Sequence, residues 1–352
     1  MIEKIIEENV WDVLEKTTLP IVVYGMGNGA DMVIDKLRHM GLEIAEVFAS
    51  DKFVRGQCFR GLRVKKYSDI CNEYDDFFIV MSFGVHDDET IENVKKMASE
   101  HPLVAPDVPV ADDTIFTREF TEAHDEVFDK AYSLLADDES RENYINILNF
   151  KVSGKIEYLF KAEKEKDFVY KEILKVGGDE IFVDLGAYDG DTIREFCEAC
   201  GGKYKKIYAF EADEKNFKKL SLKTEGLENL SLHNLAAWDK KETLVFEKRM
   251  GRNSKLSPWG IAKVNADSVD NVVNGEVTIL KMDIEGSEEK ALDGARETIV
   301  KYNPKMYVCA YHRNSDMFLL PLKIYSMCSD YRFYFYHHRY IPAWESIFYG
   351  VI

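Results

Sequence analysis

The sequence predicts an α/β protein that begins with a small parallel α/β domain, continues through a helical connector and ends in a larger parallel, Rossmann-like sheet. Three observations predict this fold class. Apolar runs, glycine turns and amphipathic stretches alternate over residues 1–111, as they do in parallel α/β units. Residues 112–178 carry apolar side chains at helical spacing with few turn signals. Over residues 179–352, successive apolar runs end in acidic or small polar residues, where parallel strands present binding groups.

The first part opens with an expected helix over Glu3–Lys16 and an expected strand over Ile21–Tyr24. A tight turn rich in glycine, Gly25-Met26-Gly27-Asn28-Gly29-Ala30, follows this strand. The elements expected next alternate between the two types: helix Met32–Met40, strand Ile44–Ala49, strand Phe77–Met81 and helix Glu89–Ser99.

Gly25, Gly27 and Asp51 form a partial dinucleotide fingerprint, in which glycines allow a close backbone approach to a pyrophosphate and an acid follows the second strand. This signal supports an alternative function. The N-terminal part would bind NAD(P) in an oxidoreductase, or it would bind a sugar nucleotide or glycan as a module without chemistry of its own. The binding module is the preferred version, because this part is too small for a complete dinucleotide domain.

The connector is expected to be helical, with its aromatic side chains mainly in the core. Tyr170 is an expected contact for the substrate. The run Gly177-Gly178-Asp179 then ends the helical segment ahead of the next strand.

The C-terminal part carries the residues that indicate chemistry. An expected strand ends in Asp184 and leads through Gly186 and Gly190 into a helix, and the next strand ends at Glu211. Carboxylates in such a turn suit a ligand with a sulfonium and an ammonium group, whereas bare amides suit a pyrophosphate. Glu211 is placed to accept both hydroxyls of a ribose. The residues expected to bind this cofactor are Asp184, Gly186, Ala187, Gly190, Asp191, Thr192, Glu211, Ala212, Ala236 and Asp283.

The segments FVDLGAYDGDT, YAFEAD, Asn234 to Ala237, ADSVDNV and ILKMDIEGSEEKALDGA, in this order, resemble the FkbM family of S-adenosylmethionine-dependent methyltransferases. The most specific element is Lys281 to Glu288, and the likeness covers about 170 residues from Asp179 onward. The resemblance implies a class I methyltransferase that transfers a methyl group, usually to oxygen, on a sugar, glycan or secondary metabolite. It also implies an antiparallel final hairpin, here Arg332 to Tyr336 and Ser346 to Tyr349.

Deprotonation of a hydroxyl acceptor needs a base, and His312 is the first candidate because imidazole titrates near neutral pH. Asp283 is the second. A divalent cation held by Asp283, Glu285 and His312 is a further alternative, although no metal is expected. The residues expected to contact the substrate are Glu285, Arg313, His337 and Tyr170.

The charge balance bears on partners. The 46 basic and 63 acidic residues give a net charge of −17, and such a surface repels phosphate backbones and anionic lipid. Nucleic acid and membrane partners are therefore not expected, and the short basic runs at 203–206 and 248–252 are interpreted as solvated surface. The first ten residues lack the pattern of a secretory signal, so a cytoplasmic protein is expected. The identity of the acceptor and homo-oligomer formation are left open.

Overall fold

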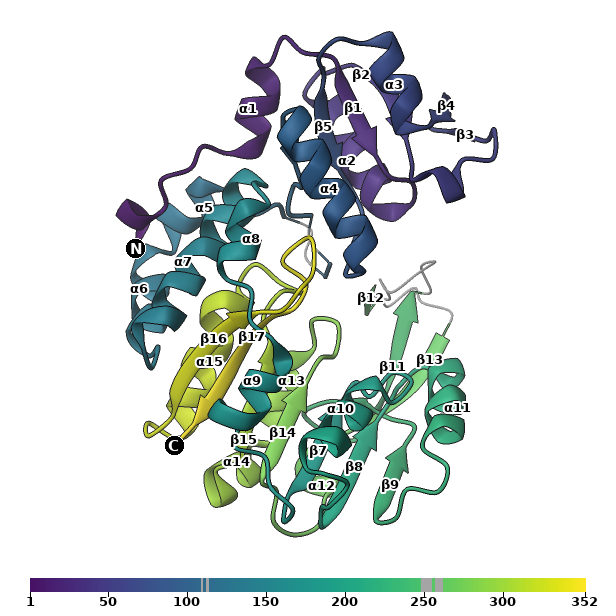
Figure 1. The fold of residues 1–352 in the computed structure, drawn as a ribbon. Helices are drawn as coiled ribbons and strands as arrows, with labels where there is room; N and C mark the ends of the chain where they lie inside the picture. The colour runs from purple at the N-terminus through teal and green to yellow at the C-terminus, as the bar shows by residue number, and fades with distance from the viewer. Residues whose placement is uncertain (109, 112–113, 248–254, 257–261) are drawn as a thin grey trace.

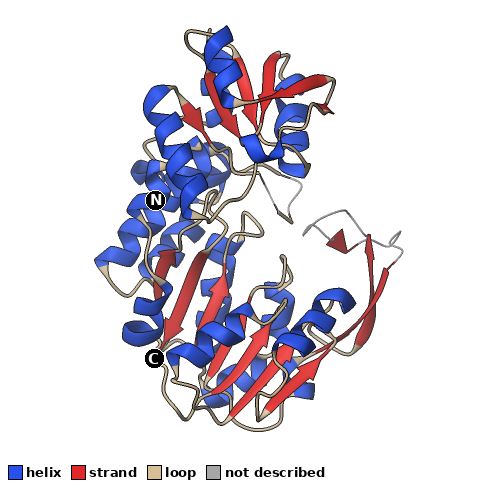
Figure 2. Cartoon of the chain, turned by 45° about the vertical axis from the view of Figure 1, so that its right-hand side comes forward, coloured by secondary structure: helices blue, strands red, loops and turns tan. Residues whose placement is uncertain are grey.

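The computed structural model describes residues 1–352 except 109, 112–113, 248–254 and 257–261. These described residues form three sheets, of six, four and seven strands. Figures 1 and 2 show the six-stranded sheet at one end of the molecule and the seven-stranded sheet at the other, with helices of the central segment along one side. The fold class predicted from the sequence, a mixed α/β protein with a Rossmann-like C-terminal sheet, is confirmed.

The N-terminal sheet has the strand order β3-β4-β2-β1-β5-β6, and all neighbours are parallel except β3 and β4. Its strands are β1 Ile21–Tyr24, β2 Ile44–Phe48, β3 Cys58–Phe59, β4 Leu62–Lys65, β5 Phe78–Met81 and β6 Leu103–Val104. Its helices are α1 Val10–Lys16, α2 Asn28–His39, α3 Tyr67–Glu73 and α4 Asp88–Glu100, with a short 3-10 turn, η2, at Asp51–Phe53. Buried side chains of α1 and α2 pack on one face of this sheet and those of α3 and α4 on the other. The expected strands and the helices after β1 and β5 are confirmed to within a few residues, and the short β3 and β4 were not predicted.

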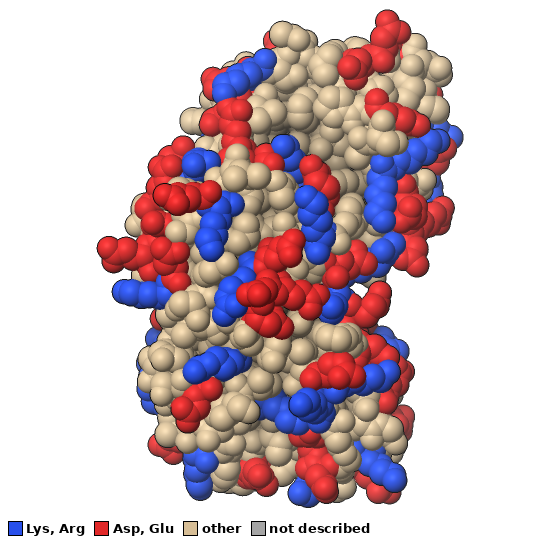
Figure 3. Space-filling model, turned by 60° about the vertical axis from the view of Figure 1, so that its left-hand side comes forward, with Lys and Arg blue, Asp and Glu red and all other residues tan. Residues whose placement is uncertain are grey.

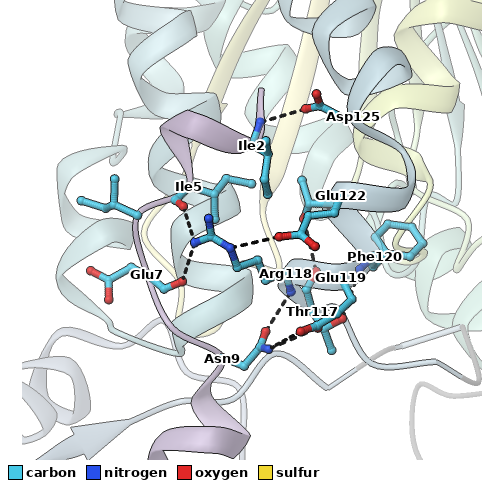
Figure 4. A network of polar contacts seen from close by, with 12 residues as sticks. Ile2, Ile5, Glu7, Asn9, Thr117, Arg118, Glu119, Phe120, Glu122 and Asp125 are labelled. Carbon is cyan, nitrogen blue, oxygen red and sulfur yellow. Dashed lines mark hydrogen bonds and ion pairs between the residues drawn. The ribbon is translucent and has the colours of Figure 1, made fainter.

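The helix expected over Glu3–Lys16 is wrong in its first half. A 3-10 turn, η1, spans Ile2–Lys4, and α1 begins only at Val10. Figure 4 shows the reason, because Arg118 donates from Nη1 to the carbonyl of Ile5 at 2.8 Å and its backbone N–H donates to Oδ1 of Asn9 at 2.8 Å. These long-range bonds tie the segment to α5 (Arg118–Ala123), and a tertiary contact outweighs the local helix propensity.

The central segment is helical, as expected. It comprises α5, α6 Asp125–Ser133, α7 Asp138–Ser153, α8 Glu157–Lys161, α9 Lys166–Phe168 and a π-helical turn, η3, at Val169–Ile173. Most of α7 is buried, and the segment packs on the C-terminal sheet, with contacts between α7 and β16 and between α6 and α15. The π-helical turn continues α9 directly and carries Tyr170. Single π-helical turns often occur at functional sites.

The C-terminal sheet has the order β16-β17-β15-β14-β7-β8-β9. Its strands are β7 Ile181–Leu185, β8 Lys206–Phe210, β9 Leu230–His233, β14 Ile279–Met282, β15 Lys305–Cys309, β16 Arg332–His337 and β17 Ser346–Val351. The five neighbouring strands β9, β8, β7, β14 and β15 are parallel. β17 runs antiparallel to β15, and β16 runs antiparallel to β17. The final antiparallel hairpin is therefore present where the resemblance implies it.

Helices cover both faces of this sheet, so the carboxyl ends of its parallel strands form one edge between two helical layers. One layer is formed by α10 Asp191–Ala199 and α11 Glu214–Lys223, next to η3. The other is formed by α7 with α12 Val269–Val272, α13 Glu288–Gly294, α14 Arg296–Tyr302 and α15 Asp316–Met327.

A four-stranded sheet with the order β10-β13-β11-β12 was not predicted. Its strands are β10 Ala236–Ala237, β11 Glu242–Glu247, β12 Lys255–Leu256 and β13 Ala262–Asp267. The expected surface run Lys248, Arg249 and Arg252 lies outside the described residues. Acidic and basic side chains are interspersed over the face drawn in Figure 3. None of the helices in the described part of the chain combines the length and apolar character needed to cross a membrane.

Candidate active site

A cavity of about 1030 Å³ lies at the carboxyl ends of β7, β8, β14 and β15. Residues of all three sequence parts line it, including His86 from the N-terminal part and Tyr170 from the central helices. Ten carboxylate side chains but only five Lys or Arg side chains are among the described residues that line it. The cavity therefore favours a ligand that carries positive charge or hydrogen-bond donors.

The turn after β7 brings two strand ends very close together. Gly186 has a φ of +83°, and a Cβ atom at this position would lie 1.8 Å from the carbonyl oxygen of Asp283. Only glycine fits such an approach. Gly190, with a φ of +90°, then precedes α10, so the turn directs the start of this helix toward the cavity.

Asp184 lies beneath this turn and is completely buried. The ammonium of Lys281 is 2.9 Å from its Oδ1 and also donates to the carbonyl of Gly186 at 2.9 Å. Burial raises the pKa of Asp184, and the charge of Lys281 partly offsets this effect. Burial disfavours the charged form of Lys281, but the carboxylates of Asp184 and Asp283 outweigh it and raise the pKa of the ammonium. This ion pair fixes β7 to β14 at the cavity, where Lys281 is part of the lining.

Glu211, directly after β8, presents a carboxylate at the cavity wall. Its Oε2 accepts from the backbone N–H of Tyr188 at 2.9 Å and its Oε1 from that of Asp213 at 2.7 Å. Each oxygen keeps a second lone pair, so the group has capacity for two further donors. Burial raises the pKa of Glu211 to about 7.

Asp283, directly after β14, is the centre of a charged network. Its Oδ1 accepts from the hydroxyl of Tyr311 at 2.9 Å and lies 3.3 Å from Nε2 of His312. Burial alone would raise the pKa of Asp283, but His312 and Lys281 outweigh it and hold the pKa below its usual range. Asp283 is therefore a carboxylate at neutral pH.

His312 lies behind this network and is 1% exposed. Its Nδ1 is 3.0 Å from Oε1 of Glu288, and its Nε2 faces Asp283. Burial would lower the pKa of the imidazole, but these carboxylates outweigh it and raise the pKa well above the usual value. His312 does not line the cavity. A protonated, enclosed imidazole cannot accept a proton from a ligand in the cavity, so this geometry does not favour the base role predicted for His312.

The residues around Asp283 include one set of side chains that could together ligate a metal ion. Among the described residues, ligand atoms of Asp283, Glu288 and His312 lie within 4.8 Å of one another. The alternative drawn from the sequence used Glu285 in place of Glu288, and Oε2 of Glu285 is 3.7 Å from Nε2 of His312. The positive charge of His312 already compensates part of the negative charge here.

The residues predicted to bind a cofactor fall into two groups. Seven line the cavity: Gly186, Asp191, Thr192, Glu211, Ala212, Ala236 and Asp283. Asp184, Ala187 and Gly190 do not, and they lie in the strand and turn that support the lining. Binding by any of them stays a prediction.

The residues predicted to contact the substrate are also divided. Glu285, Arg313 and Tyr170 line the cavity. His337 does not, because its Nε2 is 2.8 Å from the carbonyl of Tyr340 and its Nδ1 is 3.2 Å from Oγ of Ser346. Burial lowers its pKa to about 4, so His337 is a neutral core residue that holds the final hairpin, and the expectation of substrate contact is corrected.

Side-chain packing explains one of the two glycines in the N-terminal fingerprint, Gly25. A Cβ atom on Gly25 would lie 2.7 Å from the Phe83 ring, whereas one on Gly27 would meet no atom within 4 Å. Asp51 is exposed over 69% of its side chain and pairs with Lys66 at 3.4 Å. None of these three residues lines the 1030 Å³ cavity, and a second nucleotide site at Gly25, Gly27 and Asp51 stays a prediction.

The sequence did not single out several charged residues of the site. Lys166, Glu195 and Glu345 meet on the side of the cavity opposite Glu211, with Lys166 3.4 Å from both carboxylates. Lys281 and Tyr311 were likewise assigned no role in the site. Lys281 had a signal, since a lysine inside a buried strand needs a buried partner.

Comparisons with known proteins agree with this geometry. Residues 184–342 match the family of the methyltransferase FkbM domain. A crystal structure of methyltransferase FkbM from Methylobacillus flagellatus KT superimposes with a TM-score of 0.72 and 21% sequence identity, over 99% of this chain and 94% of that one. The fold of the whole chain, including its N-terminal sheet, is therefore similar to that of the solved protein.

Other solved structures match only part of the chain. An rRNA methylase from Streptococcus thermophilus aligns with 53% of this chain and 95% of its own, at 16% identity and a TM-score of 0.35. Aeropyrum pernix fibrillarin, in complex with S-adenosyl-L-methionine, aligns with 53% of this chain and 72% of its own, at 14% identity and a TM-score of 0.34. No curated protein matches the sequence significantly. Sequence motifs, strand order and the comparisons agree: residues 184–342 of this chain match the methyltransferase FkbM domain family.

Proposed function

We propose that this protein transfers a methyl group from S-adenosylmethionine to a hydroxyl group of a small molecule, sugar or glycan. The observation that carries the proposal is the Glu211 carboxylate, which lines an acidic cavity and keeps one lone pair on each oxygen for a further donor. A ribose diol supplies two such donors at one end of the nucleoside.

The residues present fit this cofactor. Glu211 would hold the ribose, and Leu235, Ala236 and Phe210 offer an apolar surface beside it for the adenine. The excess of carboxylates in the lining would stabilise the positive charges of the sulfonium and the ammonium. S-adenosylmethionine would supply, when bound, a methyl carbon that an acceptor oxygen attacks in line, with the sulfur leaving as a neutral thioether.

The chain's own contribution is alignment and charge. Asp283 lies at the end of β14, between the β7 turn and β15, and a hydrogen bond from Tyr311 and the ion pair with His312 fix its position. A carboxylate held in this way stabilises a neighbouring cation without reorganisation. Holding donor and acceptor in line is the main demand of methyl transfer.

A first experiment tests cofactor binding. Calorimetry should give a single S-adenosylhomocysteine site in the wild type, with affinity lowered in Glu211→Ala by about 1 to 3 kcal/mol, or roughly 5- to 150-fold. Glu214→Ala is the matched control, because this exposed glutamate lies three residues further on, at the start of α11. Equal affinities in the two variants would remove Glu211 from the cofactor site.

A second experiment identifies the acceptor. The protein is incubated with labelled S-adenosylmethionine and a library of sugars, glycans, sugar nucleotides and small hydroxylated metabolites, and products are analysed by mass spectrometry. A methyl ether on a neutral or cationic hydroxyl compound is the expected product. Methyl transfer only to nitrogen or carbon acceptors would contradict the proposed chemistry.

A further inference from the structure

One wall of the cavity has no part in the cofactor contacts assigned above. It is formed by Lys166 and Tyr170 from α9 and η3, Glu195 from α10, and Glu345, which directly precedes β17. Because β17 runs antiparallel to β15, Glu345 lies beyond the carboxyl end of β15, on the same sheet edge as Asp283. This wall is where an acceptor would meet the reacting edge.

Tyr170 indicates that this wall receives a ligand. The side chain is 5% exposed and lines the cavity, yet its hydroxyl has no hydrogen-bond partner among the residues that the structure describes. Burial raises the pKa of this phenol, and the charges of Glu195 and Asp184 add to the effect. A neutral, buried hydroxyl without a partner costs free energy unless a ligand or water satisfies it.

Glu345 is held in a conformation that local sequence does not favour. Its φ of +147° lies in the region that favours glycine, and such backbone strain concentrates at functional sites. The loop before it is held from outside: Ile341 exchanges backbone hydrogen bonds of 2.8 and 2.9 Å with Val85, and Arg339 pairs with Asp88 at 2.7 Å. Figure 1 shows this loop between β16 and β17, in yellow, reaching toward the N-terminal sheet. The N-terminal part thus holds the loop that leads to Glu345.

The pKa of the Glu345 carboxyl is raised, whereas that of the neighbouring Asp283 is lowered. Burial raises the pKa of Glu345, the charge of Asp283 adds to this effect, and Lys166 opposes it. Asp283 already accepts from the hydroxyl of Tyr311 and pairs with His312 at 3.3 Å, and His312 and Lys281 hold its pKa below the usual range. The pKa of His312 is raised well above its usual value, and His312 does not line the cavity. The charged and titratable groups around Glu345 are Lys166, Tyr170, Glu195, Asp283, Tyr307, Cys309, Tyr311 and Tyr349.

We propose that Glu345 is the general base of methyl transfer and that Tyr170 hydrogen-bonds the same acceptor hydroxyl. This inference rests on the proposed function. As the acceptor oxygen forms its bond to the methyl carbon, its proton moves to the carboxylate of Glu345. The carbon–sulfur bond breaks and its electron pair stays on sulfur, which becomes a neutral thioether. Glu345 then returns the proton to solvent, so atoms and charges balance over the cycle.

Sinefungin tests this placement without a known acceptor. This analogue carries an amine-bearing carbon in place of the methylated sulfur, so its ammonium occupies the position of the transferred methyl group. Wild-type protein should bind sinefungin more tightly than S-adenosylhomocysteine, because a carboxylate at that position pairs with the ammonium. Calorimetry gives both dissociation constants, and their ratio is the quantity compared between variants.

Two variants remove the charge in different ways. Glu345→Gln keeps the side-chain shape, and Glu345→Gly relieves the backbone at φ +147°, so at least one should fold. Both should lose about tenfold of the preference for sinefungin, while Glu172→Gln, an exposed glutamate on η3, should keep it. A ratio unchanged in both Glu345 variants would overturn the assignment although the cofactor site stands. Wild-type protein that binds neither compound would overturn the proposed function itself, and the inference with it.

Discussion

The ammonium of Lys281 lies 2.9 Å from Oδ1 of Asp184, and the two residues are direct register partners on the neighbouring strands β14 and β7. Both side chains are almost completely buried. A parallel sheet buried on both faces rarely contains charges, and here the pairing register places one charge against the other. The pair therefore holds together the two strand ends that carry Gly186 and Asp283.

Removing one partner should be costly because the other charge stays buried. Lys281→Met should lower the free energy of unfolding by about 3 to 5 kcal/mol, and Lys281→Met with Asp184→Leu should recover most of the loss. The measurement is chemical denaturation followed by circular dichroism. Lys290→Met is the matched control, because Lys290 pairs with Asp239 at the surface, and its loss should stay within about 0.5 kcal/mol. A Lys281 variant as stable as this control would show that the buried pair is not charged.

Gly186→Ala should disrupt the contact between the β7 turn and Asp283. The new Cβ atom would lie 1.8 Å from the Asp283 carbonyl oxygen, so the two strand ends must separate. We expect a loss of about 2 to 4 kcal/mol in stability, together with weaker S-adenosylhomocysteine binding. Gly201→Ala is the control that separates backbone strain from the steric clash. Gly201 also has a positive φ, of +62°, but no described atom lies within 4 Å of an added Cβ. This control should lose only about 1 kcal/mol. Similar losses in both variants would refute the collision argument.

Much of the fold could be predicted from the sequence because its strands are short apolar runs with clear ends. β1 spans the predicted residues Ile21–Tyr24, and β7 ends at Leu185, next to the predicted Asp184. The ends of β7, β8 and β14, which carry Asp184, Glu211 and Asp283, meet at one edge. The break before α1 could not be predicted, since it depends on Arg118, more than a hundred positions away. The four-stranded sheet was missed because its strands are short or lie in a surface hairpin.

The sequence placed the candidate residues at this edge, and their roles stay predictions. Spacing identifies which side chains reach the sheet edge, yet it does not show burial or partners. His312 and His337 have the same side chain, but three carboxylates raise the pKa of the first and burial lowers that of the second to about 4. Glu345 had no signal in the sequence, because the antiparallel return of β17 brings it to the site.

His312 should act through its charge. His312→Asn leaves Glu288, which is 1% exposed, without its cationic partner, so we expect a loss of about 2 to 4 kcal/mol at neutral pH. The raised pKa of His312 means that its stabilising contribution is complete below about pH 6.5 and is lost only well above neutral pH, as the folded-state imidazole deprotonates. Denaturation curves at several pH values check this, with His39→Asn as an exposed control. A His312 variant with wild-type stability and cofactor affinity but no turnover would instead support the base role.

Glu211 should make both stability and cofactor binding depend on pH. Its folded-state pKa of about 7 exceeds its usual value of 4.5, so the folded state binds the proton more tightly. The stabilisation is complete below about pH 4.5 and is lost as the pH rises through about 7, a change of up to about 3 kcal/mol. Glu211→Gln should remove this part of the slope, and Glu214→Gln should keep it.

Cofactor binding should show the opposite dependence. Ribose hydroxyls donate to the ionised carboxylate and so favour its charged form. S-adenosylhomocysteine affinity should therefore rise with pH up to about 7 and level off above it, and binding near neutral pH should release a fraction of a proton. Calorimetry in two buffers of different ionisation enthalpy measures this proton directly. Because Glu211→Gln has no proton to release, its binding should be weaker and independent of pH over this range. Proton uptake by the wild type would place the ribose elsewhere, since only a group that becomes more basic on binding takes up a proton.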